Sequence, residues 1–276
     1  MSDARNLTDA LDAVAAGKLI PYMGPGIAAL TSEVPASPDA LCALIEAEVR
    51  VPKRASGNMW SAAQFVESRK FRATLDDVVA RAFAPGQGVA NDVQQAIAAL
   101  RPPMVVDAWY DDGMLAAMDG RANWGWVQGV SRNGEWIEIW TRAYGSDGAE
   151  RPEGSDSSWE TLIYKPHGLA RKGSSFLMSD SDYVEVLTEI DIQSPIPEEV
   201  RHRRTDRGFF FMGCRFDDQM LRIFARQIAK RSGGGHVAVI DGPLTRMEQK
   251  FLDELNITRI DLPVSEIAAG LCAATA

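Results

Sequence analysis

The chain has 276 residues, of which 46% are hydrophobic and 24% charged, and its formal net charge is −9. This composition is typical of a globular protein with one substantial core, and the acidic balance excludes a broad surface for nucleic acid or an anionic membrane, because phosphates need clustered Lys and Arg. The three cysteines, Cys42, Cys214 and Cys272, are too far apart to form a paired-cysteine zinc module, so we expect no metal site and a reducing compartment.

Apolar spacing predicts helices and short buried strands that alternate along the chain. In chain order, we expect a helix over residues 8–16, a strand from 19, helices over 37–49, 61–70, 75–83 and 90–100, a strand over 104–106, a helix over 114–118, a strand over 162–164, a helix over 181–189, a strand over 208–212, a helix over 217–228, a strand over 236–240, a helix over 246–255, a strand over 257–260 and a helix over 265–271. Nearly all-apolar strands joined by helices predict an α/β fold, with a mostly parallel sheet and helices on both faces. We expect one domain over 1–276, with a helical insertion at 57–101 and a hairpin and loop insertion at 119–160.

Two segments carry local signals of a helix end. Ser37 followed by Pro38 is a typical N-cap with proline at the first helical position, so a helix begins there. The basic segment 201–207, with four arginines and one histidine, is typical of a solvated helix end. A binding site for anions is the less favoured interpretation of that segment.

A tryptophan-rich segment predicts a small β-hairpin. Trp124 and Trp126 precede Asn133-Gly134, a typical hairpin turn, and Trp136 and Trp140 follow it. Such a hairpin could form a lid that stacks on a base or a nicotinamide ring. A small packed core and a surface for a protein partner are the alternatives.

The turn after the first strand is the strongest local signal of a ligand site. The apolar run from Leu19 leads directly into Gly24-Pro25-Gly26. Because glycine has no Cβ, a strand followed by Gly-x-Gly lets the backbone approach a pyrophosphate closely. A plain turn is the alternative interpretation, since the third glycine of the dinucleotide-binding pattern is missing.

Unusual residues follow several of the predicted strands at the point where each strand ends. They are Gly24, Tyr110 with Asp111, His167, Gly213 and Asp241. The carboxyl ends of parallel strands meet at one edge of a sheet, and ligands of open α/β sheets bind at that edge. The sequence therefore favours a nucleotide site there over a set of unrelated turns.

Four segments of the chain match, in order, the motifs of one known family. They are residues 17–27 around Gly24-Pro25-Gly26-Ile27, Trp109-Tyr110-Asp111-Asp112, Tyr164-Lys165-Pro166-His167-Gly168, and residues 211–218 around Gly213-Cys214-Arg215. Through these segments the sequence resembles the sirtuin-like superfamily, and more narrowly its zinc-free prokaryotic branch of NAD-binding and NAD-hydrolysing domains. The resemblance implies a Rossmann-like sheet that binds NAD with the nicotinamide ribose near His167.

The resemblance also implies roles for the catalytic candidates His167, Trp109 and Asp111. Cleavage of the nicotinamide–ribose bond passes through an oxocarbenium-like sugar and needs a base near the ribose hydroxyls or water. His167 suits that role because an unperturbed imidazole accepts a proton at neutral pH. A histidine that merely fills a turn at a strand end is the alternative. Tyr110 and Asp111 would shape the nicotinamide pocket.

The remaining candidates would hold the cofactor. They are Gly24, Pro25, Gly26, Ile27, Tyr110, Gly213, Cys214, Arg215 and Asp241. Arg215 could pair with a phosphate or lie on the surface, and we leave both open. Asp241 could accept hydrogen bonds from the adenosine ribose or could simply form a turn before Gly242.

One departure from the family bears directly on activity. Trp109 stands where active relatives have an asparagine, and an indole can donate one hydrogen bond but cannot accept one. We therefore expect either an NAD glycohydrolase or ADP-ribosyl-transferring enzyme, or a catalytically weakened module that binds NAD or ADP-ribose as a sensor. An interaction protein that presents the hairpin to a partner is a third hypothesis. Deacylation is not expected, because the zinc-ribbon cysteines are absent.

The remaining expectations concern location and partners. The first five residues carry no apolar core of a secretory signal, and no run of about 18 apolar residues could span a bilayer, so we expect a cytoplasmic protein. NAD or ADP-ribose is the expected ligand. A protein partner and a homo-oligomer are left open.

Overall fold

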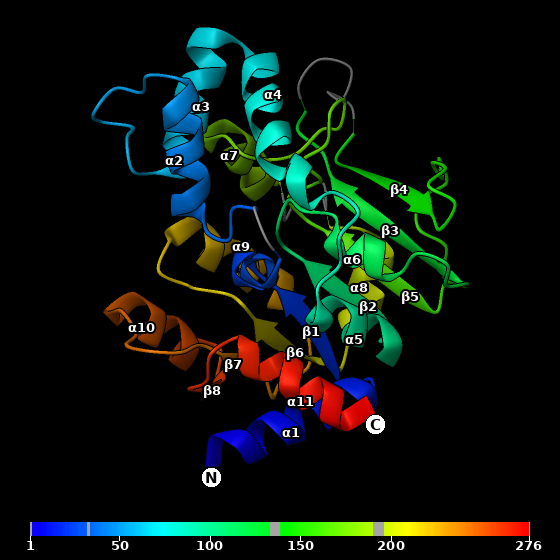
Figure 1. Ribbon diagram of the computed structural model, residues 1–276. Helices are drawn as coiled ribbons and strands as arrows, with labels where there is room; N and C mark the ends of the chain where they lie inside the picture. Colours follow the sequence, from blue (N-terminus) through cyan, green and yellow to red (C-terminus); the bar gives the residue numbers. More distant parts are fainter. Residues whose placement is uncertain (1, 32–33, 133–138, 190–195, 276) are drawn as a thin grey trace.

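The computed structural model describes residues 2–31, 34–132, 139–189 and 196–275. Within these ranges, eight strands form one sheet of order β4-β3-β5-β2-β1-β6-β7-β8 (Figure 1). The strands are β1 (Leu19–Met23), β2 (Met104–Asp107), β3 (Trp124–Gly129), β4 (Thr141–Gly145), β5 (Thr161–Lys165), β6 (Gly208–Met212), β7 (Val237–Val239) and β8 (Thr258–Ile260). All neighbouring strands are parallel except β3 and β4. The predicted α/β fold with a mostly parallel sheet is confirmed.

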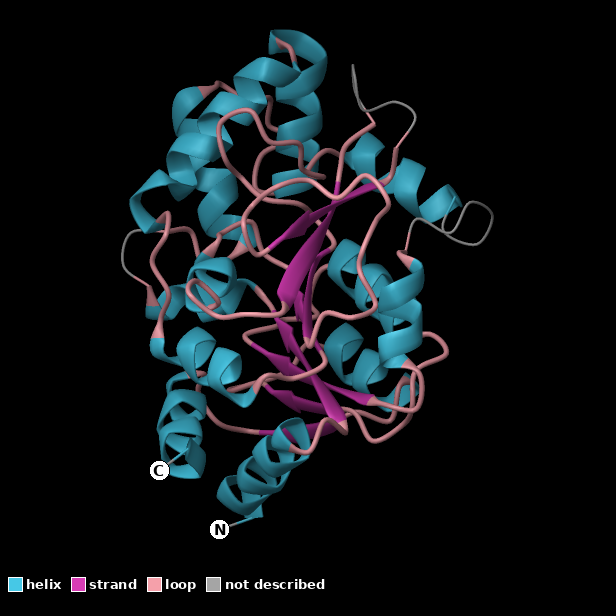
Figure 2. Ribbon diagram, turned by 90° about the vertical axis from the view of Figure 1, so that its right-hand side faces the viewer, coloured by secondary structure: helices cyan, strands magenta, loops and turns pink. Residues whose placement is uncertain are grey.

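Helices cover both faces of the sheet (Figure 2). They are α1 (Ser2–Ala15), η1 (Pro25–Leu30), α2 (Pro38–Glu48), α3 (Met59–Lys70), α4 (Arg72–Phe83), η2 (Ala84–Gly86), α5 (Asp92–Leu100), α6 (Gly113–Ala117), α7 (Asp180–Glu189), α8 (Glu198–Arg204), α9 (Gln219–Ala229), α10 (Arg246–Glu254) and α11 (Ser265–Thr275). The strands divide the buried apolar side chains into two clusters, one on each face of the sheet, because successive side chains of a strand point to opposite faces. In β1, Ile20 and Tyr22 join one cluster, whereas Leu19 and Met23 join the other.

The tryptophan-rich strands extend the main sheet instead of standing apart from it. β3 pairs antiparallel with β4, as a hairpin would, but it also pairs parallel with β5 along its whole length. Trp124 and Trp126 are buried in the apolar cluster that contains α6. These two side chains cannot act as an exposed lid, so the packed-core alternative holds for them. The Asn133-Gly134 turn and Trp136 lie outside the described residues.

The basic segment at the end of α8 was expected to be solvated, and this expectation is wrong for two of its arginines. Arg203 is buried and donates to Pro103 O at 2.6 Å and to Trp159 O at 2.7 Å. Arg204 is buried as well and donates to Ile228 O at 2.7 Å. Both guanidinium groups donate hydrogen bonds to carbonyl groups at the ends of other elements, and these bonds offset part of the free energy that burying a charged group costs.

A buried ion-pair network attaches α4 to α7 and to the segment that precedes α7. Arg72 contacts Asp182 at 2.7 Å, and it also donates to Asp76 at 2.8 Å and to the Phe176 carbonyl oxygen. The Asp182 side chain is only 2% exposed and also accepts from the Met178 backbone N–H at 2.8 Å. Charge as well as apolar packing therefore joins α4 to α7, two of the helices in the upper part of Figure 1.

We expect Arg72→Met to lower the free energy of unfolding by about 3 kcal/mol, because it leaves the buried Asp182 carboxylate without its cation. Arg81→Met is the matched control: Arg81 pairs with Glu48 where both side chains are more than half exposed, so its loss should cost less than about 1 kcal/mol. Urea unfolding of the three proteins measures both effects. Equal losses for the two variants would contradict the structural role given to Arg72.

Candidate functional site

The direction in which the chain adds strands to the sheet reverses at β1. From β1 the chain first builds β2, β3 and β5 on one side, and it then returns to build β6, β7 and β8 on the other. In open α/β sheets the loops diverge at such a switch point and leave a crevice outside the carboxyl ends of the strands. The turns after β1 and β6 border this crevice.

These two turns pack backbone against backbone. The Gly24 N–H donates to Met212 O at 2.8 Å, and the Gly26 N–H donates to Gly213 O at 2.8 Å. A Cβ on Gly24 would lie 2.6 Å from the Cys214 sulfur, and one on Gly213 would lie 2.5 Å from Ile27 N. The glycines therefore allow a close approach between two parts of the chain itself. Ile27 and Cys214 are buried behind this contact.

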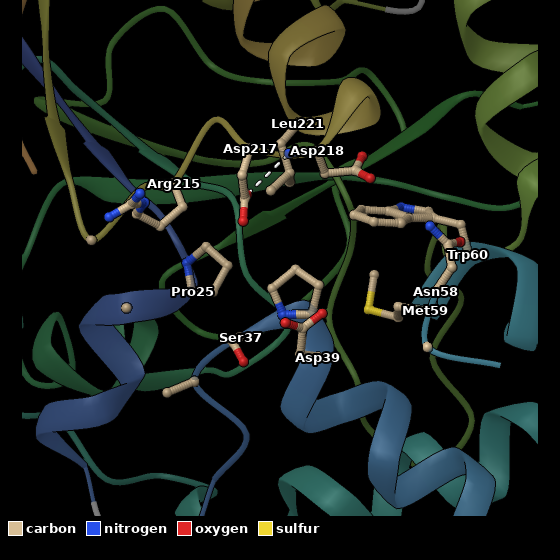
Figure 3. A pocket seen from close by; sticks show the side chains of 15 residues that line it. Pro25, Ser37, Asp39, Asn58, Met59, Trp60, Arg215, Asp217, Asp218 and Leu221 are labelled. Carbon is tan, nitrogen blue, oxygen red and sulfur yellow. Dashed lines mark hydrogen bonds between the residues drawn. The ribbon is translucent and has the colours of Figure 1, made fainter. Parts of the chain in front are cut away.

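A cavity of about 250 Å³, which we call the switch-point pocket, opens beside the two turns (Figure 3). Its lining residues are Pro25, Gly26, Ala36, Ser37, Pro38, Asp39, Gly57, Asn58, Met59, Trp60, Gly213, Arg215, Asp217, Asp218 and Leu221. Of the residues predicted to hold the cofactor, Pro25, Gly26, Gly213 and Arg215 meet here. Gly24, Ile27, Tyr110, Cys214 and Asp241 do not line the pocket.

The N-termini of three helices converge on the switch-point pocket. Each begins at a polar cap: Ser37 Oγ accepts from Ala40 N at 3.0 Å in α2, Asn58 Oδ1 from Ser61 N at 2.9 Å in α3, and Asp218 Oδ1 from Met220 N at 2.6 Å in α9. Helix N-termini carry partial positive charge and favour anions. From the sequence, Ser37 was expected only as a cap, and Asp218 only as part of a helix that starts at residue 217. The shared feature that could have identified them is that caps of separate helices face the same sheet edge.

Carboxylates partly offset this positive potential. Asp39, Asp217 and Asp218 all line the pocket, and Figure 3 shows Asp217 between Arg215 and Asp218. Asp217 accepts from the Asp218 backbone N–H at 3.0 Å. Burial raises the pKa of the Asp218 carboxyl. The pocket thus offers acceptors for hydroxyl groups next to the N-termini that favour an anion.

Arg215 ties the turn after β6 to the turn after β7. It forms a two-point ion pair with the buried Glu248, at 2.7 and 2.9 Å, and donates to Asp241 O and Pro243 O at 3.1 Å each. It lines the pocket with its side chain 41% exposed while it is held in this ion pair, so both roles considered for it, a partner for a phosphate and a surface residue, stay open. Asp241 is exposed and takes part through its main-chain oxygen.

His167 follows β5 but lies in the core instead of lining the switch-point pocket. It is 3% exposed, its Nδ1 is 2.8 Å from the Tyr183 hydroxyl, and its ring packs 4.5 Å from that of Phe224. Burial, together with the nearby Lys165, lowers its pKa to about 3. The imidazole is therefore neutral at pH 7 and is a weaker base than a solvated histidine.

Lys165 and Asp107 form a fully buried ion pair next to His167. Lys165 Nζ lies 2.6 Å from Asp107 Oδ2 and donates to the Trp109 carbonyl oxygen at 2.9 Å. Burial raises the pKa of the Asp107 carboxyl, an effect that Lys165 opposes. The sequence analysis gave neither residue a role, although both stand at the carboxyl ends of central strands.

Trp109, Tyr110 and Asp111 point to three different places. The Trp109 indole N–H donates to Pro35 O at 2.7 Å, and the Tyr110 hydroxyl donates to Leu177 O at 2.7 Å, both inside the core. Asp111 accepts from Gly113 N at 3.0 Å at the start of α6, and it lines a separate cavity of about 420 Å³. The structure therefore does not bring the catalytic candidates Trp109 and Asp111 together with His167 around one cavity.

Two absences apply to the described part of the chain. No group of three or more His, Cys, Asp or Glu side chains there could hold a metal ion. No helix there has both the length and the apolar character needed to cross a bilayer.

We expect Gly213→Ala to destabilise the fold by more than about 2 kcal/mol, because the added methyl group meets Ile27 N and φ is +64°. Gly173→Ala is the control: φ is +80°, but nothing lies within 4 Å of the added Cβ, so only the conformational cost of about 1 kcal/mol applies. Thermal or urea unfolding separates the two. A Gly213→Ala loss no larger than the control would rule out the tight contact between the turns.

The buried neutral His167 predicts a specific pH dependence of stability. The unfolded chain binds a proton near pH 6.5 and the folded chain only near pH 3, so the stability from the neutral ring is full above pH 6.5 and falls as the pH drops toward 3. Between pH 7 and 5 this amounts to about 2 kcal/mol. Asp107, with its raised pKa, changes in the opposite sense. The measurement is therefore the difference between wild type and His167→Gln in urea unfolding, and a difference that is independent of pH would contradict it.

A family model described as the SIR2-like domain matches residues 103–260, which is more than half of the chain and runs from before β2 to the end of β8. No curated protein matches the chain. The chain belongs to the SIR2-like domain family.

Proposed function

We propose that this protein binds NAD or ADP-ribose in the switch-point pocket. The observation that carries the proposal is the convergence of the N-termini of α2, α3 and α9 on a cavity at the switch point of the sheet. A pyrophosphate suits this position because three helix N-termini favour negative charge there. Membership of the SIR2-like family supports the same ligand class. We also propose that the protein is cytoplasmic, as expected from the sequence.

The lining side chains fit the rest of such a ligand. Asp39 and Asp217 can accept hydrogen bonds from ribose hydroxyls, as carboxylates do in other dinucleotide sites. The Trp60 indole N–H is buried and has no hydrogen-bond partner among the described residues, so it suits an acceptor atom of the ligand. At about 250 Å³ the cavity is smaller than the roughly 300 to 1,000 Å³ of common ligand pockets. We infer that it encloses one part of the dinucleotide and leaves the remainder along the sheet edge.

Cleavage of NAD at the nicotinamide–ribose bond is the second candidate, and the hydrogen bond between His167 and Tyr183 favours it, because it orients an imidazole at a strand end. Three features favour binding without turnover. His167 is buried with a pKa lowered to about 3, it does not line the pocket, and the Trp109 N–H is already bonded to Pro35. Glycohydrolase or ADP-ribosyl-transfer activity would need His167 to become accessible.

Titration calorimetry with NAD and with ADP-ribose tests the binding. We expect saturable binding of at least one of them, and Trp60→Phe should weaken it about tenfold by removing one buried donor. Trp159→Phe is the matched control, since Trp159 is also buried but packs against Gly125 in β3. Absence of binding to both ligands would overturn the proposal.

The same samples decide between binding and cleavage. Incubation with NAD, followed by chromatography for nicotinamide, should show no release above the buffer control. Release that His167→Gln abolishes would replace the binding module with an NAD-cleaving enzyme.

A further inference from the structure

A second cavity lies against β3, away from the switch-point pocket. It has a volume of about 520 Å³ and is bounded by β3, by α6, by the turn at residues 145–148 and by residues 169–174. This volume is within the range of small-ligand pockets. We call it the β3 pocket. In the sheet, β5 and β2 separate β3 from β1. The β3 pocket and the switch-point pocket have no lining residue in common.

Two buried polar atoms in the β3 pocket lack hydrogen-bond partners. Among the described residues, three buried side-chain polar atoms are unpartnered, and two of them, Trp124 Nε1 and Gln128 Oε1, belong to side chains that line this pocket. Trp124 is 6% exposed and Gln128 is 3% exposed. Buried polar atoms are nearly always paired, because leaving one unpaired costs about 1–3 kcal/mol. Both atoms are themselves covered by neighbouring groups, so a ligand reaches this donor and this acceptor once the indole and the amide turn toward the pocket.

The spacing of these residues indicates the shape of that ligand. Trp124, Trp126 and Gln128 alternate along β3 and so lie on one face of the sheet, with the first and last about 13 Å apart along the strand. Between them, the ring of Trp126 stacks on that of Tyr144, with centroids 4.3 Å apart and an angle of 17°. A flat apolar wall between a donor and an acceptor suits a planar ring compound with polar groups at both ends.

The charges of the pocket exclude a phosphate. Arg171 is the one cationic side chain among the described residues that line it, and it is already paired with Asp112. The other charged lining residues are Asp119 and Asp147, and Asp147 pairs with Arg151 at 2.9 Å. An anionic ligand would find no unpaired cation and would face carboxylates instead.

We propose that the β3 pocket binds an uncharged nitrogen heterocycle of the nucleobase or nucleoside class. An acceptor of the ligand takes the Trp124 N–H, a donor of the ligand bonds Gln128 Oε1, and its ring lies against the wall formed by Trp126 and Tyr144. The site is separate from the pocket proposed for NAD or ADP-ribose, and it would allow an unphosphorylated base or nucleoside to bind at the same time.

The test is a calorimetric titration of the full chain with adenine, guanine, hypoxanthine, cytosine and uracil, with their nucleosides, and with the corresponding 5′-monophosphates. We expect at least one base or nucleoside to bind, and its 5′-monophosphate to bind at least tenfold more weakly. Trp124→Phe and Gln128→Leu should each weaken binding about tenfold. Trp159→Phe, at a buried tryptophan that does not line the β3 pocket, should leave it unchanged.

Each contrary result overturns the proposal. If no member of the panel binds wild type, water satisfies the two polar atoms and the pocket is not a site of this class. Binding that neither Trp124→Phe nor Gln128→Leu alters would place the ligand elsewhere. A 5′-monophosphate that binds as tightly as its nucleoside, and that both variants weaken to the same extent, would contradict the charge argument. Thermal melting checks folding: Gln128→Leu removes an unpartnered polar atom at nearly constant volume and should melt no lower than wild type, whereas Trp124→Phe also removes buried ring atoms and should melt slightly lower while still unfolding cooperatively.

Discussion

The backbone contact between the turns after β1 and β6 is the constraint on which the candidate site depends. Gly26 donates to Gly213 O, and the absence of side chains on Gly24 and Gly213 lets the two turns touch. This contact fixes where η1 begins and where the chain leaves β6 toward α9. The N-termini of these helices can then share one cavity with those of α2 and α3. The Gly-x-Gly spacing positions the site by packing the chain against itself.

The charged and polar groups near this edge of the sheet form two sets, one in the interior and one around the switch-point pocket. On the interior side, Lys165 and Asp107 neutralise each other in the core, and His167 stays uncharged between Tyr183 and Phe224. On the pocket side, helix N-termini and carboxylates remain available to a ligand. Of the groups that the family resemblance marks as catalytic, His167 and Trp109 therefore pack in the core and Asp111 lines a separate cavity, whereas the groups suited to hold a nucleotide come mainly from helix starts.

The order of helices and strands could be predicted because it depends on local periodicity, and the cap at Ser37 could be predicted because its partner lies three residues away. Contacts between distant segments could not. Pairing of β3 with β5 joins residues about 37 positions apart and turned a predicted separate hairpin into part of the sheet. Arg203 is buried because the Pro103 and Trp159 carbonyl groups converge on it. Contacts between distant segments also decide where Trp109, Asp111 and His167 lie. From the sequence we expected these residues in one site, whereas the fold places them in different environments.

The unpartnered polar atoms are informative because other costly buried polar groups of the described residues have hydrogen-bond partners. The chain buries Lys165, Arg203 and Arg204 and gives each of them hydrogen-bond acceptors. A fold that pairs groups as costly as these has no physical reason to leave an indole N–H or an amide oxygen unpaired unless something else pairs with it. The three unpartnered atoms found among the described residues, on Trp60, Trp124 and Gln128, all belong to side chains that line cavities. Their shared position favours ligand recognition over accidental imperfection of the core, and it does so independently at two separate pockets.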